Sequence, residues 1–295
     1  MNKYKIIAIF ACHTNCIKKY ISTLSNINNI YDHIEKFIII DSLNEEFALR
    51  LKDDLKNNNK LVNHYLIQNN IYLDFGKWVH VLSDYDLEKY DNILLINDSI
   101  IVTNDISQYF NYFQKLNKEI NLYAYNDSTQ LNIYHYQSYL FMINKKIIIK
   151  FINFFNSRKP FIKDEKSLIE QMELNLTNID TNHDCFLKIG TEHNKHKNIF
   201  WENDSLYEKL IKDKSFHIFK LKKLNDHYKN FHYTIEKYIN MFDKNFYLLN
   251  YSDLEKFKDV LDLKKHFIEY GFNEGRKAYN YTLSIIPQYC TEKLN

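Results

Sequence analysis

The chain has 295 residues, of which 45% are hydrophobic and 16% aromatic, so it can bury a sizeable core and disorder is not expected. Its 39 basic and 37 acidic residues leave a net charge of +2, and no basic stripe is interleaved with aromatics, which argues against a nucleic-acid partner. The four glycines are never clustered and there are only three arginines, so a Gly-rich phosphate loop is excluded and guanidinium contacts to phosphate are scarce. A bound diphosphate would have to be held by Lys, His, backbone N–H groups or a metal.

The amino-terminal residues show no charged-then-apolar signal pattern, and no apolar run approaches the roughly 18 residues of a membrane span. We therefore expect a cytoplasmic protein without a transmembrane segment. The four cysteines lack the spacing of a zinc site, so we expect reduced, buried thiols.

The first 120 residues alternate short apolar strands with amphipathic helices. Strands are predicted at residues 4–12, 37–40, 61–67 and 93–96. Helices are predicted after each strand: one carrying Ile17, Tyr20, Ile21 and Leu24, one over about 45–56, one capped by Asp74, and one beginning near 104–105 that buries Ile106, Tyr109, Phe110 and Phe113. This alternation predicts an α/β fold with a mostly parallel sheet.

Every strand of this half is followed by polar residues, which would lie together at one edge of a parallel sheet. Those that we single out are His13, Thr14, Asp41, Asp74, Asn97, Asp98 and Ser99. Ligands of open α/β sheets bind at the carboxyl ends of the strands. Asp98 leaves a fully apolar strand and is the first candidate for touching substrate, in an open crevice. The alternative for each residue is a turn or helix cap.

Beyond residue 120 we expect strands at 122–125 and 136–143, a helix over 145–155, a helix over 167–176, and a polar loop over 181–198. The loop contains His183, His193 and His196. These histidines leave open a third class of function, a metal-dependent hydrolase.

Five segments, in order over about residues 4–225, resemble the rhamnan-synthesis F-type proteins, which are GT-A-type glycosyltransferases of polysaccharide and lipopolysaccharide assembly. The segments are YDNILLINDSIIV (90–102), NNIYLDFGKWVHVL (69–82), YNDSTQLNIYHYQSYLFMINKKII (125–148), LIEQMELNLT (168–177) and NIFWENDSLYEKLIKDKSFHIFKLKKL (198–224). The third matches at Asp127, Ser128, His135, Gln137, Ser138 and Tyr139. The sequence departs from the pattern at Tyr72, where the family has Gly, and in its D-x-D motif, which keeps one carboxylate as Asp98-Ser99-Ile100.

The resemblance implies a GT-A-like α/β fold and transfer of a sugar from a nucleotide-diphosphate donor to a glycan or glycoprotein acceptor. The name of the family suggests rhamnose or another deoxysugar as the transferred sugar. The donor would contact His13, Thr14, Asp41, Asp74, Asn97, Asp98, Ser99 and Lys220. Asp98 would bind the diphosphate directly or through Mg²⁺ or Mn²⁺. Asp127 and then Glu173 are the candidates for activating the acceptor hydroxyl.

Residues 242–280 are similar to a short helical module found on polysaccharide-forming glycosyltransferases, with a capping box at Ser252 and Glu255 and a helix end at Gly271. We therefore expect a GT-A-like domain over residues 1–232 and a helical module over residues 233–295. The alternative to an enzyme is a carbohydrate-binding or scaffold protein that keeps the glycosyltransferase fold without turnover.

Overall fold

The computed structural model describes residues 4–13, 17–41, 58–66, 72–103, 106–116, 119–129, 133–189 and 217–221, together with residue 55 and several residues between 244 and 270. Its strands are β1 (Ile6–Cys12), β2 (Lys36–Asp41), β3 (Leu61–Leu66), β4 (Asn92–Asn97), β5 (Ile100–Val102), β6 (Leu122–Ser128), β7 (His135–Tyr136), β8 (Leu140–Asn144), β9 (His183–Leu187) and β10 (Ile218–Lys220). Its α-helices are α1 (Ile17–Ile30), α3 (Leu73–Asp84), α4 (Ser107–Lys115), α5 (Ile148–Arg158) and α6 (Glu165–Gln171).

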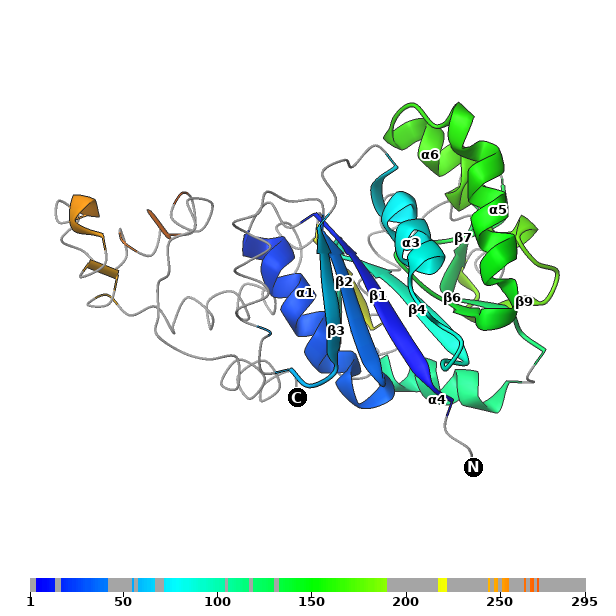
Figure 1. Ribbon diagram of the computed structural model, residues 1–295, viewed down its shortest axis with the longest axis horizontal. Helices are drawn as coiled ribbons and strands as arrows, with labels where there is room; N and C mark the ends of the chain where they lie inside the picture. Colours follow the sequence, from blue (N-terminus) through cyan, green and yellow to red (C-terminus); the bar gives the residue numbers. More distant parts are fainter. Residues whose placement is uncertain are drawn as a thin grey trace.

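One sheet forms the centre of the molecule, with the strand order β3-β2-β1-β4-β8-β6-β7 and with β9 paired to β6 (Figure 1). The strands β3, β2, β1 and β4 are parallel neighbours. Strand β8 is antiparallel to both β4 and β6, so β6 points the same way as β4. This sheet is mixed but mostly parallel, which confirms the predicted α/β fold class.

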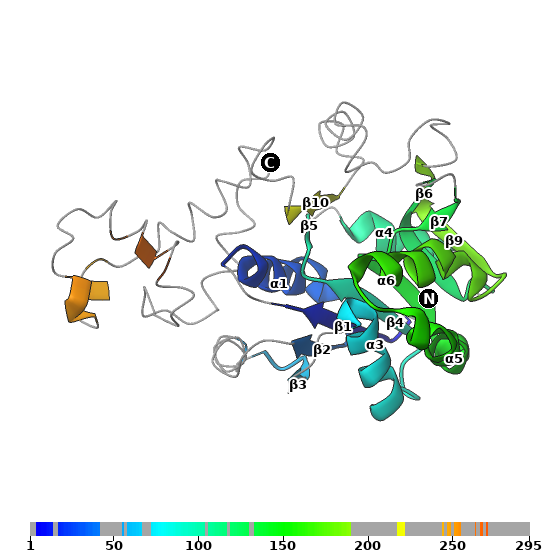
Figure 2. The same cartoon turned by 90° about the horizontal axis from the view of Figure 1, so that it is seen from above.

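Helices cover both faces of the sheet, because the strands are apolar on both sides. Alternate residues of β1 face opposite layers: Ile6, Ala8 and Phe10 pack in the cluster that contains α1 and α4. Ile7 and Ile9 pack in the cluster that contains α3 and α5. Figure 2 shows α1 and α4 above the sheet and α3 and α5 below it. Burial on both faces explains why the strands have continuous apolar sequences.

The polar edge of α1 holds β5 in place. Asn26 is fully buried, and its side-chain amide donates to Ile100 O at 2.8 Å and accepts from Val102 N at 2.8 Å. Ser22 donates to Ile100 O as well, and Asn29 donates to Val102 O at 2.6 Å. The side chain of Asn26 thus takes the place of a neighbouring strand for β5, whose other edge pairs with β10.

Several predicted boundaries are wrong. The strand predicted over 136–143 is split into β7 and β8, and the helix predicted over 167–176 ends at Gln171 and continues as a 3₁₀ turn from Glu173 to Asn178. The helix predicted over 145–155 begins with a 3₁₀ turn, Lys145–Ile147. The polar loop predicted over 181–198 contains β9. This strand lacks an apolar pattern in the sequence, because only Cys185 among its five residues is buried.

Asp74 does not cap α3. The capping position is Tyr72, Leu73 adopts the left-handed backbone conformation (φ 44°), and Asp74 lies in the first turn of the helix. The helix predicted over 45–56 and most of the carboxyl-terminal module, including Glu255 and Gly271, lie outside the described residues. Within the described part of that module, Ser252–Leu254 form a 3₁₀ turn. Among the residues that are described, no helix is long and apolar enough to cross a membrane.

Candidate functional site

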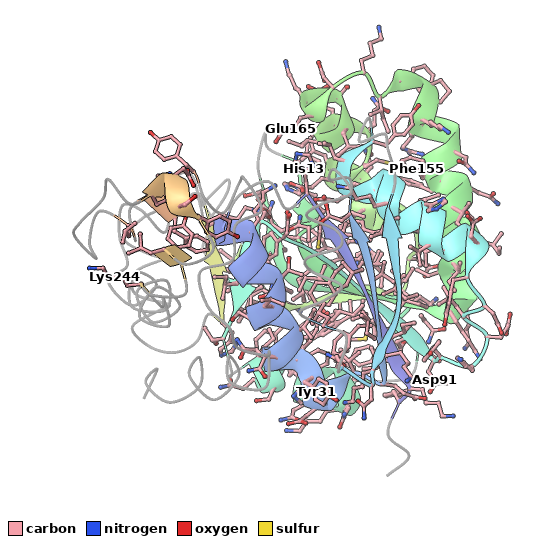
Figure 3. The ribbon with its side chains drawn as sticks, turned by 60° about the vertical axis from the view of Figure 1, so that its left-hand side comes forward. His13, Tyr31, Asp91, Phe155, Glu165 and Lys244 are labelled. Atoms are coloured by element: carbon pink, nitrogen blue, oxygen red, sulfur yellow. The ribbon has the colours of Figure 1, made fainter. Side chains whose placement is uncertain are left out.

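The carboxyl ends of β1, β2, β4 and β6 meet at one edge of the sheet, where β8 begins. The chain leaves β1 toward β2 and β3 on one side, and it returns to the other side of β1 as β4. The boundary between β1 and β4 is therefore a switch point, at which open α/β sheets bind ligands. In Figure 3 His13, which follows β1, lies at the opposite end of the molecule from Tyr31 and Asp91, which mark the other edge.

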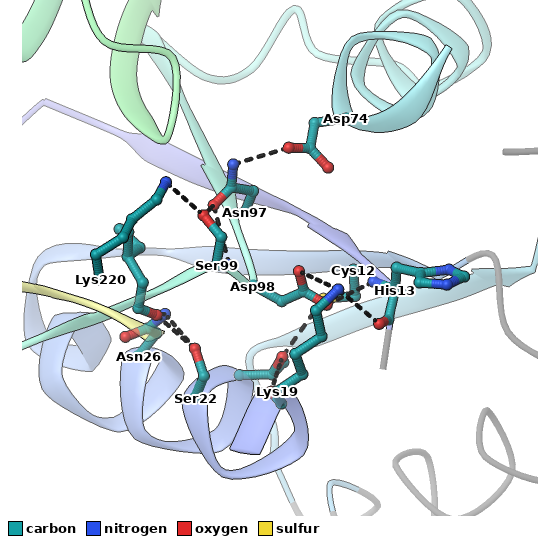
Figure 4. Close-up of polar contacts among 12 residues, drawn as sticks. Cys12, His13, Lys19, Ser22, Asn26, Asp74, Asn97, Asp98, Ser99 and Lys220 are labelled. Carbon is teal, nitrogen blue, oxygen red and sulfur yellow. Dashed lines mark hydrogen bonds and ion pairs between the residues drawn. The ribbon is translucent and has the colours of Figure 1, made fainter. Parts of the chain in front are cut away.

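Asp98 joins the ends of β1 and β4. Its Oδ2 accepts a hydrogen bond from the backbone N of His13 at 2.6 Å, and its Oδ1 lies 3.5 Å from the ammonium of Lys19 on α1. Lys19 also donates to His13 O at 3.0 Å (Figure 4). The side chain of Asp98 is only 5% exposed, so the expectation that it opens into a crevice is wrong. Its carboxylate therefore binds the backbone of His13 and the ammonium of Lys19 within the protein.

Burial shifts the pKa values of Asp98 and His13. Desolvation raises the pKa of Asp98, opposed by Lys19 and by the hydrogen bond from His13. Desolvation, with the charges of Lys19 and Lys77, lowers the pKa of His13. The partly buried imidazole of His13 is therefore neutral at pH 7 and is able to accept or donate a hydrogen bond.

A chain of hydrogen bonds crosses the edge from β10 to α3. Lys220 Nζ donates to Ser99 Oγ at 2.9 Å, and Ser99 Oγ donates to Asn97 Oδ1 at 2.6 Å. Asn97 Nδ2 then donates to Asp74 Oδ2 at 2.7 Å (Figure 4). Desolvation raises the pKa of Asp74, opposed by Lys77 and by the hydrogen bond from Asn97. The chain fixes the orientation of the Asn97 amide and leaves Ser99, Lys220 and Asp74 partly exposed.

A second polar group lies where β8 begins. Asn97 N donates to Tyr139 O at 3.2 Å, which brings the segment before β8 to the end of β4. Ser138 Oγ donates to Glu173 Oε2, and Gln137 Nε2 lies 3.5 Å from Glu173 Oε1. His135 is fully buried; its Nδ1 donates to Ile133 O at 2.9 Å, so its Nε2 accepts from Gln137 at 3.1 Å. Buried donors thus orient the partly exposed carboxylate of Glu173.

The other predicted residues divide into two groups. Asp41 and Asp127 are at the same edge but buried, with exposures of 0% and 1%, so neither side chain faces a ligand directly. Thr14 lies outside the described residues, as do His193 and His196. His183 lies in β9, and its Nδ1 is 2.7 Å from Tyr136 Oη, which places it in the packing of the sheet.

The described residues do not fit a divalent metal. They contain no group of three or more His, Cys, Asp or Glu side chains that could hold one. Both carboxylate oxygens of Asp98, the predicted ligand, are taken up by His13 N and Lys19. Mg²⁺ and Mn²⁺ need several oxygen ligands. Among the described residues, the site therefore lacks the ligand set of a divalent metal.

Sequence reasoning missed two cations of the site, Lys19 and Lys77. Lys19 follows the first strand by seven residues, and the apolar pattern that predicts α1 carries no information about the polar residues of that helix. Lys77 is 1% exposed although it carries a charge, and its position three residues after Asp74, between Phe75 and Trp78 of the apolar face, is the signal that could have found it.

No family model matches the sequence, and no curated protein matches it. Among solved structures, the chain is similar to HddC from Yersinia pseudotuberculosis, with 13% identity and a TM-score of 0.41 over 62% of this chain and 90% of that one. It is similar to the glycosyltransferase GlyE of Streptococcus pneumoniae TIGR4, with 14% identity and a TM-score of 0.42 over 63% of this chain and 45% of that one. It is also similar to the inositol-1-phosphate CTP transferase from T. maritima, with 9% identity and a TM-score of 0.40 over 64% and 87% of the two chains.

These neighbours, a glycosyltransferase and a CTP transferase among them, are distant structural relatives, and the chain spans less than half the length of GlyE. The TM-scores are 0.42 or less, which is too low for these structures to assign a function to the chain. The residues of the site define an α/β protein with a polar cluster at the switch point of a mostly parallel sheet.

Proposed function

We propose that the protein is a glycosyltransferase that transfers a sugar from a nucleotide-diphosphate donor to a glycan acceptor. The observation that carries the proposal is the layer of partly exposed polar side chains over the β1–β4 switch point, built on buried Asp98 and Asn97. Its members are His13, Lys19, Asp74, Ser99, Lys220 and Glu173. The carboxylates and neutral imidazole suit the hydroxyls of a ribose or sugar, and the ammonium groups suit a diphosphate.

The resemblance to rhamnan-synthesis F-type proteins supports this proposal, and it suggests rhamnose or another deoxysugar as the donor sugar. The matched residues Asn97, Asp98, Gln137, Ser138 and Tyr139 include those whose backbone and side chains connect the two polar groups.

Glu173 is the better candidate for the base that activates the acceptor. A general base must come within hydrogen-bond reach of the hydroxyl whose proton it takes. Asp127 is 1% exposed and does not meet this requirement, whereas Glu173 is partly exposed and its carboxylate is oriented by Ser138. In the proposed reaction Glu173 accepts the acceptor proton, the acceptor oxygen bonds to the anomeric carbon, and the bond to the diphosphate breaks to release the nucleotide.

A thermal-shift screen with nucleotides and nucleotide-sugars, followed by an assay of nucleotide release, tests the proposal. A ligand that binds only the native state raises the melting temperature. We expect release that depends on acceptor and that Glu173→Gln lacks. The matched control is Glu170→Gln, three residues earlier on an exposed face, which should release nucleotide like the wild type. If no nucleotide or nucleotide-sugar binds, the proposal is wrong.

The burial of Asp98 favours a second candidate, a carbohydrate-binding scaffold with a glycosyltransferase fold, because the carboxylate expected at the donor is already paired within the protein. Glycan binding without nucleotide release in the same assays would support the scaffold and contradict the enzyme.

A further inference from the structure

Glu173 has a hydrogen-bond donor beside each of its two carboxylate oxygens. Ser138 Oγ donates to Oε2, and Gln137 Nε2 lies 3.5 Å from Oε1. The strand that precedes these donors, β7, packs directly against the 3₁₀ turn that Glu173 begins. The backbone of Gln137 is held as well, because its N donates to Asn126 O at 3.2 Å. With the backbone fixed, the orientation of the Gln137 side-chain amide determines what faces Oε1.

A side-chain amide has two ends of similar size and opposite polarity. The NH₂ group of Gln137 stabilises the Glu173 carboxylate, whereas the amide oxygen in the same place would repel it. At 3.5 Å the contact is long for a hydrogen bond, but the sign of the interaction still depends on which end of the amide faces Oε1. The group that selects this end therefore influences the orientation of the proposed base.

His135 is the group in contact with this amide. Its imidazole is fully buried, and its Nδ1 lies 2.9 Å from Ile133 O, a carbonyl oxygen that can only accept a hydrogen bond. Nδ1 therefore carries the proton, and Nε2 of the neutral ring has only a lone pair to offer. That Nε2 is 3.1 Å from Gln137 Nε2, so the amide turns its NH₂ group toward the imidazole. The same NH₂ group faces Glu173 Oε1.

We infer that His135 is a positioning residue for Glu173, which it orients through the side-chain amide of Gln137. This inference rests on the proposed function, in which Glu173 accepts the proton of the acceptor hydroxyl. A general base has to present a lone pair within hydrogen-bond reach of that hydroxyl. With one donor on each oxygen, the partly exposed carboxylate keeps a fixed plane for this task. His135 is buried and acts without touching the substrate.

The alternative is a purely structural role, because the bond from His135 Nδ1 to Ile133 O also fixes the segment before β7. Two substitutions separate these roles. The shorter amide of His135→Asn reaches the place of Nδ1, so it can donate to Ile133 O but offers Gln137 no acceptor. The longer amide of His135→Gln reaches the place of Nε2, so it can accept from Gln137 but leaves Ile133 O without this donor. Each variant thus keeps one of the two contacts.

The assay measures acceptor-dependent release of nucleotide from UDP-glucose, UDP-galactose, GDP-mannose and dTDP-rhamnose, with the methyl glycosides of glucose, galactose and rhamnose as acceptors. His135→Asn and Gln137→Met should each lower kcat about ten- to a hundredfold, as expected for a misplaced base, with KM for the donor within about twofold of the wild type. His135→Gln should keep kcat within about threefold, although its melting temperature should fall because a buried carbonyl loses a donor.

A double variant and a control complete the set. His135→Asn combined with Gln137→Met should lose no more kcat than either single variant, because both substitutions act through the same contact. The matched control is His80→Asn, in which the replaced imidazole is exposed on α3, and it should release nucleotide like the wild type.

The reverse order of activities, with His135→Gln slow and His135→Asn as fast as the wild type, would assign the effect to the bond with Ile133 O and overturn the inference. Wild-type kcat in Gln137→Met, which leaves the contact between His135 and Ile133 intact, would also overturn it, even if neither His135 variant folds. The proposed function stands in both cases, because the wild type releases nucleotide. A wild type that neither binds nor turns over any of these donors would overturn both.

Discussion

Asn26 offers a sharp test of how the turn at Asp98 is held. Its amide is fully buried and bonds both Ile100 O and Val102 N, the backbone that directly follows the turn. Asn26→Ala would leave buried backbone groups of β5 without these partners, each worth about 1–3 kcal/mol. Because Ser22 still donates to Ile100 O, we expect a total cost of about 2–4 kcal/mol and a fall in melting temperature of roughly 4–16 °C.

Urea denaturation followed by circular dichroism measures this cost. The matched control is Asn28→Ala, a partly buried neighbour on α1, which should change stability by no more than about 0.5 kcal/mol. Asn26→Asp adds a pH signature: an ionised carboxylate accepts from Val102 N but repels Ile100 O, whereas the protonated acid can donate to it. The Asp variant should therefore gain stability as the pH falls. If Asn26→Ala unfolds within about 0.5 kcal/mol of the wild type, the reasoning is refuted.

Three further predictions concern the site and α3. Ser138→Ala should reduce kcat more than it raises KM, because it removes the hydroxyl that orients Glu173. Ser138→Thr should recover part of the activity, and equal activity in the wild type and both variants would contradict this role. Asp74→Asn should raise the melting temperature at pH 7. The pKa of Asp74 is raised in the folded protein, so ionisation of this carboxyl lowers the free energy of unfolding as the pH rises, and Asn does not ionise. The gain should shrink as the pH falls toward about 4, and a gain independent of pH would argue against the raised pKa. Gly76→Ala should destabilise by about 1–3 kcal/mol despite better helix propensity, because its Cβ would lie 2.7 Å from Tyr72 Cβ; the same change in a Tyr72→Gly background should be harmless, and an equal cost there would exclude the clash as the cause.

The sequence predicts the strands of the first half because each is a short apolar run that is buried on both faces. It also predicts which edge carries the polar side chains, since parallel strands bring their carboxyl ends together. Both predictions depend on local pattern and chain direction alone. The edge strand β9 is not predicted, because four of its five residues are only partly buried and give no strand pattern. It forms a strand by pairing with β6, which is distant in sequence.

The pairing of individual side chains could not be predicted in the same way. The sequence predicts an exposed Asp98 carboxylate, but the structure pairs it with His13 N and Lys19. These partners are 85 and 79 residues away in the chain, so no local pattern indicates them. Glu173, which accepts a hydrogen bond from Ser138, is the first residue of the 3₁₀ turn that follows α6, a turn that the sequence pattern does not predict. Such contacts follow from tertiary structure, not from spacing.

Hydrogen exchange of the wild-type protein with a saturating nucleotide-sugar, identified by the thermal-shift screen, tests the central claim most directly. The account predicts slower amide exchange in the residues around His13, at 97–99 and at 73–77, because these segments form the carboxyl edge at the switch point. Exchange in α4, which packs against Tyr4 and His33 at the opposite edge of the sheet, should not change. Protection confined to α4 or other surfaces, with no change at the carboxyl edge, would contradict the account.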